Sequence, residues 1–391
     1  MSSKLNIGVI GIGGRGQVAH HAHNPKNGVR LVAAADVVDA CLEQFVNRFG
    51  PDVMTTHDYR EVLQQDDIQA VFVCSPDFLH EEQAVAALNA GKHVFLEKPM
   101  AITIAGCDRI LRAAMDNDMK LYLGHNMRHM GFTLKMKELV DRGAIGEVRT
   151  GWCRHFVSYG GDAYFKNWNA ERKKSTSLLL QKATHDIDVL HWLCGSYTRR
   201  VSGMGNLTVY NRVTDRRDSS EPGDKTWYEE NWPPLSQKGL SPDMDVEDLN
   251  LIMMELENDV LCSYQQCHYS PDGWRNYTII GTEGRLENFG DLPGECVVRV
   301  WNRRVHYQAS GDEEYPIAEA VGGHGGADPR IVKEFIDHIR NDVPLSVSAI
   351  ASRNSVATGC MAAESLRDGS TPRDIPPVAD DLLEYFTARG H

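Results

Sequence analysis

Residues 5–16 read Leu-Asn-Ile-Gly-Val-Ile-Gly-Ile-Gly-Gly-Arg-Gly, a short apolar run that passes directly into a glycine-rich turn. Gly11, Gly13 and Gly16 follow the spacing G-x-G-x-x-G, and Asp36 closes the next apolar run 20 residues after Gly16. The first glycine of such a turn permits the tight bend, the second lets a pyrophosphate approach the backbone, and the third lets a helix pack against the strand. The stretch therefore predicts a strand, a turn and a helix that together bind a dinucleotide.

The residues of this turn are the first candidates for cofactor contact: Gly11, Ile12, Gly13, Gly14, Arg15 and Gly16. Asp36 can accept hydrogen bonds from both ribose hydroxyls of an adenosine. A 2′-phosphate would meet this carboxylate, and Val37 and Val38 offer no cation to offset the repulsion. The sequence therefore favours NAD over NADP. Arg15 keeps NADP open, because a flexible guanidinium could reach a 2′-phosphate.

Further apolar runs of a few residues follow this first strand, as expected for parallel strands that are buried on both faces. Stretches with helical character separate them, and Gly50 and Gly91 stand where helices are expected to end. This alternation predicts a parallel sheet with helices on both faces over residues 1–126. The predicted strands are 31–35, 70–74, 93–96 and 120–123, and the predicted helices are 39–49, 79–90 and 104–117.

The remaining chain, residues 127–391, has a different pattern and predicts an α+β domain with a large, mostly antiparallel or mixed sheet. Asn258-Asp259 is a plausible hairpin turn between two of its strands. Residues 212–247 are polar, with little periodicity, and indicate a long surface arm. Closing helices within residues 329–366 are expected to pack back near the domain junction. The predicted strands are 147–158, 201–210, 249–256, 260–269, 277–281 and 296–301.

Composition excludes several classes of protein. The 391 residues carry 41 Lys and Arg against 54 Asp and Glu, a net charge of −13, which disfavours nucleic acid and anionic membranes as partners. Nine scattered cysteines without a Cys-x-x-Cys pair predict neither a disulfide framework nor a zinc ribbon. His20, His21 and His23 lack a second set of ligands, so no metal site is expected. A cytoplasmic protein is the simplest expectation, because no apolar run approaches the length of a membrane helix.

Residues 178–195 predict one helix that ends at Gly195. Gln181, Lys182 and His185 share a face of this helix with Leu178 and Val189. Polar groups on an otherwise apolar face are costly to bury unless they are paired. These three side chains therefore either line a wet cleft or belong to a satisfied network.

Taken together, four motifs resemble those of the Gfo/Idh/MocA oxidoreductases, the family named for glucose–fructose oxidoreductase and inositol dehydrogenase. The resemblance extends over nearly the whole chain, and Glu-Lys-Pro is its most specific part. The motifs are the glycine turn, Ser75-Pro76-x-x-x-His80, Glu97-Lys98-Pro99 and Thr184-His185-Asp186-Ile187-Asp188.

The resemblance implies a Rossmann domain that binds a nicotinamide dinucleotide, with Ser75, Pro76, His80, Glu97 and Lys98 added to the cofactor site. It implies oxidation or reduction of a secondary alcohol of a sugar, sugar derivative or cyclitol. Lys98 is then the catalytic lysine that hydrogen-bonds the reacting hydroxyl, and His185 is the proton acceptor. The family habit is a homodimer or homotetramer.

The sequence departs from the family pattern at two places. Many members carry Asp four residues before the helix histidine, whereas this chain has Gln181, which cannot take up a proton. The glycines that usually precede this helix are replaced by Ser175-Thr176-Ser177. Candidates for substrate contact are Asn126, Arg128, Trp168, Gln181 and Lys182.

Two alternative functions remain open at this point. A redox-assisted glycoside-cleaving enzyme would oxidise a ring carbon transiently and recycle its NAD. A catalytically silent dinucleotide-binding sensor would need neither Lys98 nor His185, so the presence of both residues favours an enzyme.

Overall fold

The computed structural model describes residues 4–224 and 226–389 and divides the chain into two compact units. The first unit comprises Met1–His129, Gly322–Arg353 and Pro377–His391, and the second comprises Met130–Val321 and Asn354–Pro376. This division differs from a single cut after residue 126, because two C-terminal segments return to the first unit. Sequence periodicity shows that a helix has an apolar face, but it does not show which core that face joins.

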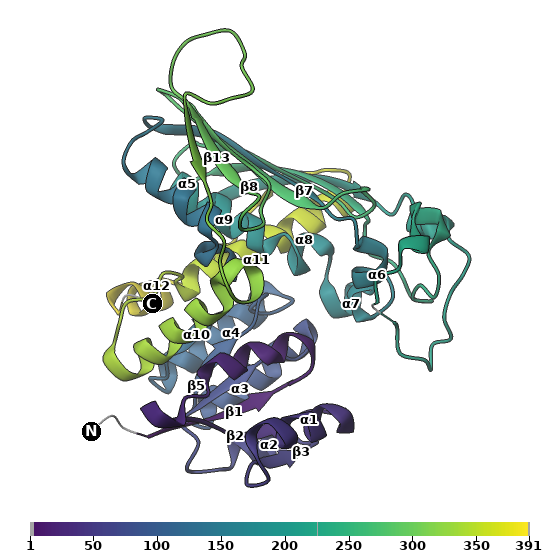
Figure 1. Ribbon diagram of the computed structural model, residues 1–391, viewed down its shortest axis with the longest axis vertical. Helices are drawn as coiled ribbons and strands as arrows, with labels where there is room; N and C mark the ends of the chain where they lie inside the picture. The colour runs from purple at the N-terminus through teal and green to yellow at the C-terminus, as the bar shows by residue number, and fades with distance from the viewer. Residues whose placement is uncertain (1–3, 225, 390–391) are drawn as a thin grey trace. The chain divides into compact units, whose positions relative to one another are not determined.

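The first unit contains a six-stranded parallel sheet in the order β3-β2-β1-β4-β5-β6 (Figure 1). This is the strand order of a Rossmann fold. It brings the carboxyl ends of β1, β4 and β5 side by side, and these strands are followed by Gly11, Cys74 and Glu97. The strands are β1 Leu5–Ile10, β2 Val29–Ala35, β3 Met54–Thr56, β4 Ala70–Val73, β5 His93–Leu96 and β6 Leu121–Leu123.

Helices cover this sheet and complete its core. Phe335 of α10 lies edge-on to Phe72 and Phe95, with ring centroids 5.5 and 5.6 Å apart, which explains why α10 belongs to the first unit. The segment after the glycine turn is a 3-10 helix, η1. The helical segments are η1 Gly14–Ala22, η2 Pro25–Asn27, α1 Asp39–Phe49, α2 Tyr59–Leu63, η3 Asp77–Leu79, α3 His80–Asn89, α4 Ile104–Asp116, η4 Asn126–His129, α10 Gly323–Asn341 and α12 Asp380–Ala388, with α11 Ala349–Arg367 beginning in this unit.

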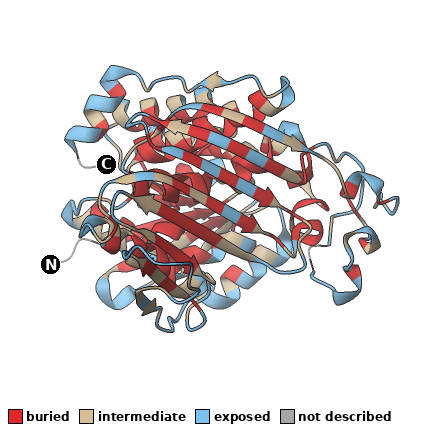
Figure 2. Ribbon diagram, turned by 90° about the horizontal axis from the view of Figure 1, so that it is seen from above, coloured by how far each residue is buried: buried red, intermediate tan, exposed pale blue. Residues whose placement is uncertain are grey.

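The second unit contains a nine-stranded sheet in the order β14-β13-β12-β11-β7-β10-β9-β8-β15. β10 pairs with β7 in parallel and the other pairings are antiparallel, so the predicted mixed, mostly antiparallel sheet is confirmed. Buried and exposed residues alternate along its strands (Figure 2). The strands are β7 Val148–Phe156, β8 Thr198–Asn206, β9 Leu249–Leu256, β10 Leu261–Cys267, β11 Trp274–Gly281, β12 Arg285–Phe289, β13 Val297–Trp301, β14 Glu313–Pro316 and β15 Arg373–Asp374.

The helix predicted over residues 178–195 is two helices. The amide of Ala183 donates to the carbonyl of Leu178 at 3.1 Å, five residues back, and this wide turn separates α8 from α9. Gly195 ends α9 in the left-handed conformation, as predicted. The helical segments of this unit are α5 Gly131–Asp141, α6 Gly160–Tyr164, η5 Trp168–Ala170, α7 Arg172–Ser175, α8 Leu178–Gln181, α9 Thr184–Cys194, η6 Tyr210–Arg212, η7 Glu229–Asn231 and η8 Pro234–Ser236.

The polar arm over residues 212–247 is organised around one buried carboxylate. Asp162 of α6 accepts hydrogen bonds from Lys166 at 2.8 Å, Asn231 at 2.7 Å and Gln237 at 3.3 Å. An apolar cluster that includes Val213, Leu240 and Val246 holds the arm together with these polar contacts, and hydrophobic periodicity reveals neither. None of the helices formed by residues 4–224 and 226–389 has the length and apolar character that crossing a bilayer requires.

Candidate active site

The glycine turn packs directly against the end of β4, and this close approach explains its glycines. Gly11 has φ +79°, and a Cβ atom there would lie 2.8 Å from the backbone nitrogen of Ser75. A Cβ atom on Gly16 would lie 2.0 Å from the carbonyl oxygen of Gly11. Any larger residue at either position would push the turn away from the sheet.

Asp36 is fixed beside this turn. One carboxylate oxygen accepts from the amides of Ile12 at 2.8 Å and Gly13 at 3.2 Å, and the other accepts from the amide of Val38 at 3.0 Å. The side chain of Val37 is exposed next to it. A ribose on this turn would meet a carboxylate with lone pairs to spare and an apolar neighbour, which fits the adenosine half of NAD.

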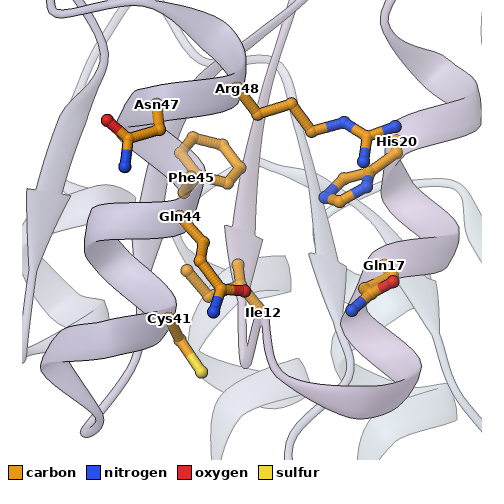
Figure 3. A pocket seen from close by; sticks show the side chains of 8 residues that line it. All are labelled: Ile12, Gln17, His20, Cys41, Gln44, Phe45, Asn47 and Arg48. Carbon is orange, nitrogen blue, oxygen red and sulfur yellow. The ribbon is translucent and has the colours of Figure 1, made fainter.

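A groove of about 350 Å³ opens between η1 and α1 beside the turn (Figure 3). Cys41 lies at one end, where its sulfur would be 3.4 Å from a Cβ atom on Gly13, and Arg48 and His20 lie at the other. Burial and the charge of Arg48 lower the pKa of His20 to about 4, so this imidazole is neutral at pH 7. Arg48 therefore lies at the opposite end of the groove from Cys41 (Figure 3).

Arg15 is held inside the first unit. Its Nε lies 2.7 Å from Oε1 of Glu97, and its Nη1 lies 2.8 Å from Oδ2 of Asp328. Burial by itself would lower the pKa of Arg15, but Glu97 and Asp328 raise it above its ordinary value. Asn126 donates to the second oxygen of Asp328 at 3.5 Å. The guanidinium is therefore engaged with two carboxylates of the first unit.

Lys98 stands at the carboxyl edge of the parallel sheet, directly after β5 and the buried Glu97. The backbone amide of Lys98 donates to Oε2 of Glu97 at 3.2 Å, and the Lys98–Pro99 peptide bond is cis. Arg15 and the Lys98 amide thus hold the two oxygens of Glu97 and fix the backbone that carries Lys98. The lysine side chain keeps partial exposure.

His80 braces this edge from behind. Its Nδ1 lies 2.7 Å from the carbonyl oxygen of Pro99, and its Nε2 lies 2.9 Å from that of Ser75. Burial lowers the pKa of His80, although the two carbonyl oxygens act in the opposite direction. The ring therefore links the backbone segments that carry Ser75 and Lys98. Both ring nitrogens face backbone carbonyls, so His80 positions these segments. The hydroxyl of Ser75 donates to Gln83 at 2.6 Å.

In the second unit, His185 lies in the first turn of α9 next to a residue that the sequence analysis did not single out. Asp186 is fully buried and accepts hydrogen bonds from Nε of Arg275 at 2.9 Å, from the hydroxyl of Tyr264 at 3.0 Å and from Tyr277. Burial would raise the pKa of Asp186, but Arg275 chiefly holds it below its usual range. These contacts fix the first turn of α9 and with it the backbone of His185.

His155 of β7 completes this network. Its Nδ1 lies 3.3 Å from Asp186, yet burial and the charge of Arg275 lower the pKa of His155 to about 3. His155 is therefore neutral at pH 7, and Arg275 supplies the charge that balances Asp186. The Thr-His-Asp motif contained Asp186, but its partners come from strands far away in the chain, so the motif alone did not reveal the network.

The residues predicted to contact substrate fall in both units. In the first unit, Arg128 is buried and donates to the carbonyl of Ser346 at 3.0 Å, and Asn126 joins Asp328, so both support the local fold. The second unit contains Trp168 on η5, Gln181 at the end of α8, and Lys182 in the break before α9. Across the described parts of both units, no three metal-binding side chains come together.

Comparison with known proteins assigns both units to one family. Residues 5–125 match the Gfo/Idh/MocA family, described as "Oxidoreductase family, NAD-binding Rossmann fold", and residues 137–374 match its C-terminal alpha/beta domain. The putative oxidoreductase YteT of Bacillus subtilis is 26% identical over 344 residues, which cover 77% of this chain and 80% of that protein. Inositol 2-dehydrogenase of Salmonella typhimurium is 29% identical over 191 residues, and this match spans 48% of this chain and 54% of that enzyme.

A solved structure, levoglucosan dehydrogenase in complex with NADH and levoglucosan, has the same fold. It superimposes with a TM-score of 0.76 at 21% identity and covers 96% of this chain and 100% of that one. The glycine turn and Asp36 have the residue types and spacing that a dinucleotide-binding turn requires. The chain belongs to the Gfo/Idh/MocA oxidoreductase family, and NAD is the dinucleotide of its Rossmann unit.

Proposed function

We propose that the protein is an NAD-dependent dehydrogenase that interconverts a secondary alcohol of a sugar, sugar derivative or cyclitol and the corresponding ketone. Its relatives carry the names inositol 2-dehydrogenase and levoglucosan dehydrogenase, which supports this class of substrate. The observation that carries the proposal is the fixed position of Lys98, because both oxygens of the buried Glu97 are engaged and the lysine follows at the cofactor edge of the sheet.

The proposed cofactor contacts come from the glycine turn, Asp36 and the segment after β4 that begins with Ser75 and Pro76. NAD⁺ held by these residues would supply the hydride acceptor for the carbinol carbon when the alcohol is oxidised. Glu97 contributes by holding Arg15 and the backbone of Lys98 rather than by contacting the ring. Arg15 stabilises the glycine turn through its ion pairs with Glu97 and Asp328.

In this proposal Lys98 and His185 have separate roles at the reacting hydroxyl. The ammonium of Lys98 donates a hydrogen bond to the reacting oxygen and stabilises the negative charge that develops on it. The imidazole of His185 accepts the hydroxyl proton, a task suited to a group that titrates near neutral pH. Asp186 keeps the turn that carries His185 in place. Trp168, Gln181 and Lys182 remain the proposed substrate contacts in the second unit.

We also propose that the protein forms a homo-oligomer through the outer face of the nine-stranded sheet. Met204 and Met253 on this face are 62% and 65% exposed, and Leu251 and Leu261 are exposed beside them. Met204, Leu251 and Met253, together with Trp152 and neighbouring residues, line a hollow of about 560 Å³. An exposed apolar surface on adjacent strands is typical of an interface between subunits, and a second copy of the chain is the proposed partner.

A spectrophotometric screen tests the proposed function. Monosaccharides, inositols and glycosides are incubated with NAD⁺ or NADP⁺, and steady NADH formation from at least one polyol is expected. Lys98→Ala should lower kcat by about 10²- to 10⁴-fold and leave the Kd for NAD within about threefold. Lys333→Ala is the matched control, because Lys333 is an exposed lysine of the same unit.

The screen also separates the alternatives. A Lys98→Ala variant with unchanged turnover would remove Lys98 from the mechanism. Glycoside cleavage without net NADH would replace the dehydrogenase with a redox-assisted cleaving enzyme. If the wild type neither forms NADH nor cleaves a glycoside with any compound of the panel, the result would favour a dinucleotide-binding sensor.

A further inference from the structure

Lys182, one of the proposed substrate contacts, forms a cluster with two tyrosines in the second unit. The Nζ atom of Lys182 lies 6.0 Å from the ring centroid of Tyr159 and 5.5 Å from that of Tyr164. The ammonium group thus has a phenol ring on each of two sides. Tyr159 is 36% exposed, Lys182 is partly exposed and Tyr164 is buried, so a small solute can reach the cluster from the side of Tyr159.

Two features of the local sequence place these side chains. The break between α8 and α9 falls at Lys182, which leaves the regular helix at this point. Gly160 and Gly161 follow Tyr159, and a Cβ atom on Gly160 would lie 2.0 Å from the carbonyl oxygen of His268. The start of α6 therefore packs tightly on the end of β10, and this contact fixes the backbone of Tyr159.

No carboxylate oxygen of the described residues lies within ion-pairing distance of Lys182, and its charge reaches Asp291 only from farther away. Its neighbour Arg275 is balanced by Asp186 at 2.9 Å and lies 3.7 Å from Asp291. Burial would lower the pKa of Lys182, but Tyr159 and Tyr164 raise it, so the ammonium group stays charged at neutral pH. A cation so placed, without a counter-ion, is a binding point for an anion.

His268 adds an independent sign of a ligand. It is fully buried, and within the described residues neither of its ring nitrogens has a hydrogen-bond partner. Its ring lies 5.2 Å from the ring of Tyr164. Burial, the proximity of His155 and the charge of Lys182 hold the pKa of His268 well below its usual value, so the neutral ring offers one donor and one acceptor. A buried polar group without a partner is explained by a ligand or an ordered water at that point.

We propose that this cluster binds a carboxylate and that the substrate is an acidic sugar or cyclitol, such as a uronate, an aldonate or a carboxylated cyclitol. Lys182 is the counter-ion, and the hydroxyl groups of Tyr159 and Tyr164 are additional donors to the carboxylate oxygens. This inference rests on the proposed dehydrogenase function and specifies its substrate class. It also accounts for Gln181, because a carboxylate at that neighbouring position would repel an acidic substrate.

Binding measurements with matched pairs of sugars test the proposal. The probes are D-glucuronate against D-glucose and D-galacturonate against D-galactose, added to the protein with NADH bound and followed by calorimetry. The acids should bind about 10- to 100-fold more tightly than their neutral parents, the range that charge-assisted hydrogen bonds supply. Lys182→Met should abolish this preference and Lys182→Arg should largely keep it. Lys174→Met is the matched control, because Lys174 already pairs with Glu171 at 2.8 Å.

Tyrosine ionisation gives a second readout that needs no turnover. Lys182 and Arg275 lower the pKa of Tyr159, whereas burial and Asp291 act against them. A bound carboxylate competes for Lys182, so D-glucuronate should move the lowest tyrosinate absorbance step to higher pH. The step should disappear in Tyr159→Phe and persist in Tyr307→Phe, which removes an exposed tyrosine. The same tyrosine should make binding depend on pH, because the affinity for D-glucuronate should fall as Tyr159 loses its proton.

The outcomes distinguish this inference from the proposed function. If neutral polyols bind and are oxidised while the acids show no preference, the carboxylate site is refuted and the dehydrogenase stands. A preference that survives in Lys182→Met would also refute the site. If neither acids nor neutral polyols bind or react, both the site and the proposed function fail.

Discussion

Asp186→Asn is the substitution that most directly tests how the second unit holds its histidine. The change keeps the size of the side chain but removes the charge that faces Arg275 at 2.9 Å. It also replaces an oxygen that accepts hydrogen bonds with an amide that donates them, next to the hydroxyls of Tyr264 and Tyr277. The site cannot relax into water, because Asp186 is fully buried.

The expected loss of stability follows from removing the nearer carboxylate of a buried arginine, because Arg275 then keeps only Asp291, 3.7 Å away. Removing one partner of a buried ion pair costs about 3–5 kcal/mol. Since a domain is stable by roughly 5–15 kcal/mol in total, the variant should lose a large share of its free energy of unfolding. Asp186→Asn/Arg275→Met should recover part of this loss, because both charges are then absent.

Urea denaturation followed by circular dichroism measures these free energies, and the double-mutant cycle isolates the coupling between the two residues. Arg285→Met is a control at a partly exposed arginine whose partner, Glu287, lies 2.6 Å away on the same strand. A loss below about 1 kcal/mol for Asp186→Asn, or a double variant no more stable than the single one, would refute the reasoning.

The same pair determines a pH dependence. The pKa of Asp186 is lower in the folded protein than the value of about 3.9 expected in the unfolded chain. The unfolded chain therefore takes up the proton first, and the stabilisation by Asp186 is complete above that value. It is lost as the pH falls through the lower, folded pKa. Wild type should lose stability on acidification in this range, and Asp186→Asn should lose less.

Three further predictions concern the cofactor, the subunit interface and the glycine turn. Asp36→Asn should lower the affinity for NAD by about 10-fold or more and that for NADP much less, as measured by calorimetry, because the lost carboxylate binds the ribose hydroxyls. An equal loss of affinity for both would refute the NAD preference. Met253→Glu should shift the protein toward the monomer in light scattering, with Leu134→Glu, an exposed position outside the sheet, as the control; an unchanged mass would reject the proposed face. Gly16→Ala should disrupt the turn and abolish NAD binding, because its Cβ atom would lie 2.0 Å from Gly11, whereas Gly14→Ala meets open space but keeps a strained positive φ and should cost less.

Much of the first unit could be predicted because its signals are local. A parallel strand buried on both faces appears as a short apolar run, and β1 and α1 have the bounds expected for them. The short β3 was not predicted, because three residues at the sheet edge carry too little pattern. The helix over residues 178–195 was predicted as continuous, because its hydrophobic periodicity continues through the wide turn at Lys182.

In the candidate site, too, the residues in local motifs could be predicted and their distant partners could not. Lys98 and His185 stand in recognisable motifs, whereas the groups that fix them come from distant parts of the chain. Glu97 is oriented by Arg15, 82 residues away, and Asp186 by Arg275, 89 residues away. Tyr159 and Tyr164 carry no motif, so only the folded chain shows them beside Lys182.

The sequence by itself determined the dinucleotide turn, the acid that favours NAD and the class of fold, because backbone geometry and strand burial impose residue types at fixed spacings. Tertiary structure alone decided that Arg15 is tied to Glu97 and Asp328, that His80 braces the backbone, and that Lys182 keeps a charge without a carboxylate partner in the described chain. The physical reason is that charge balance and hydrogen-bond satisfaction depend on which side chains meet in space, and residues far apart in sequence determine those meetings.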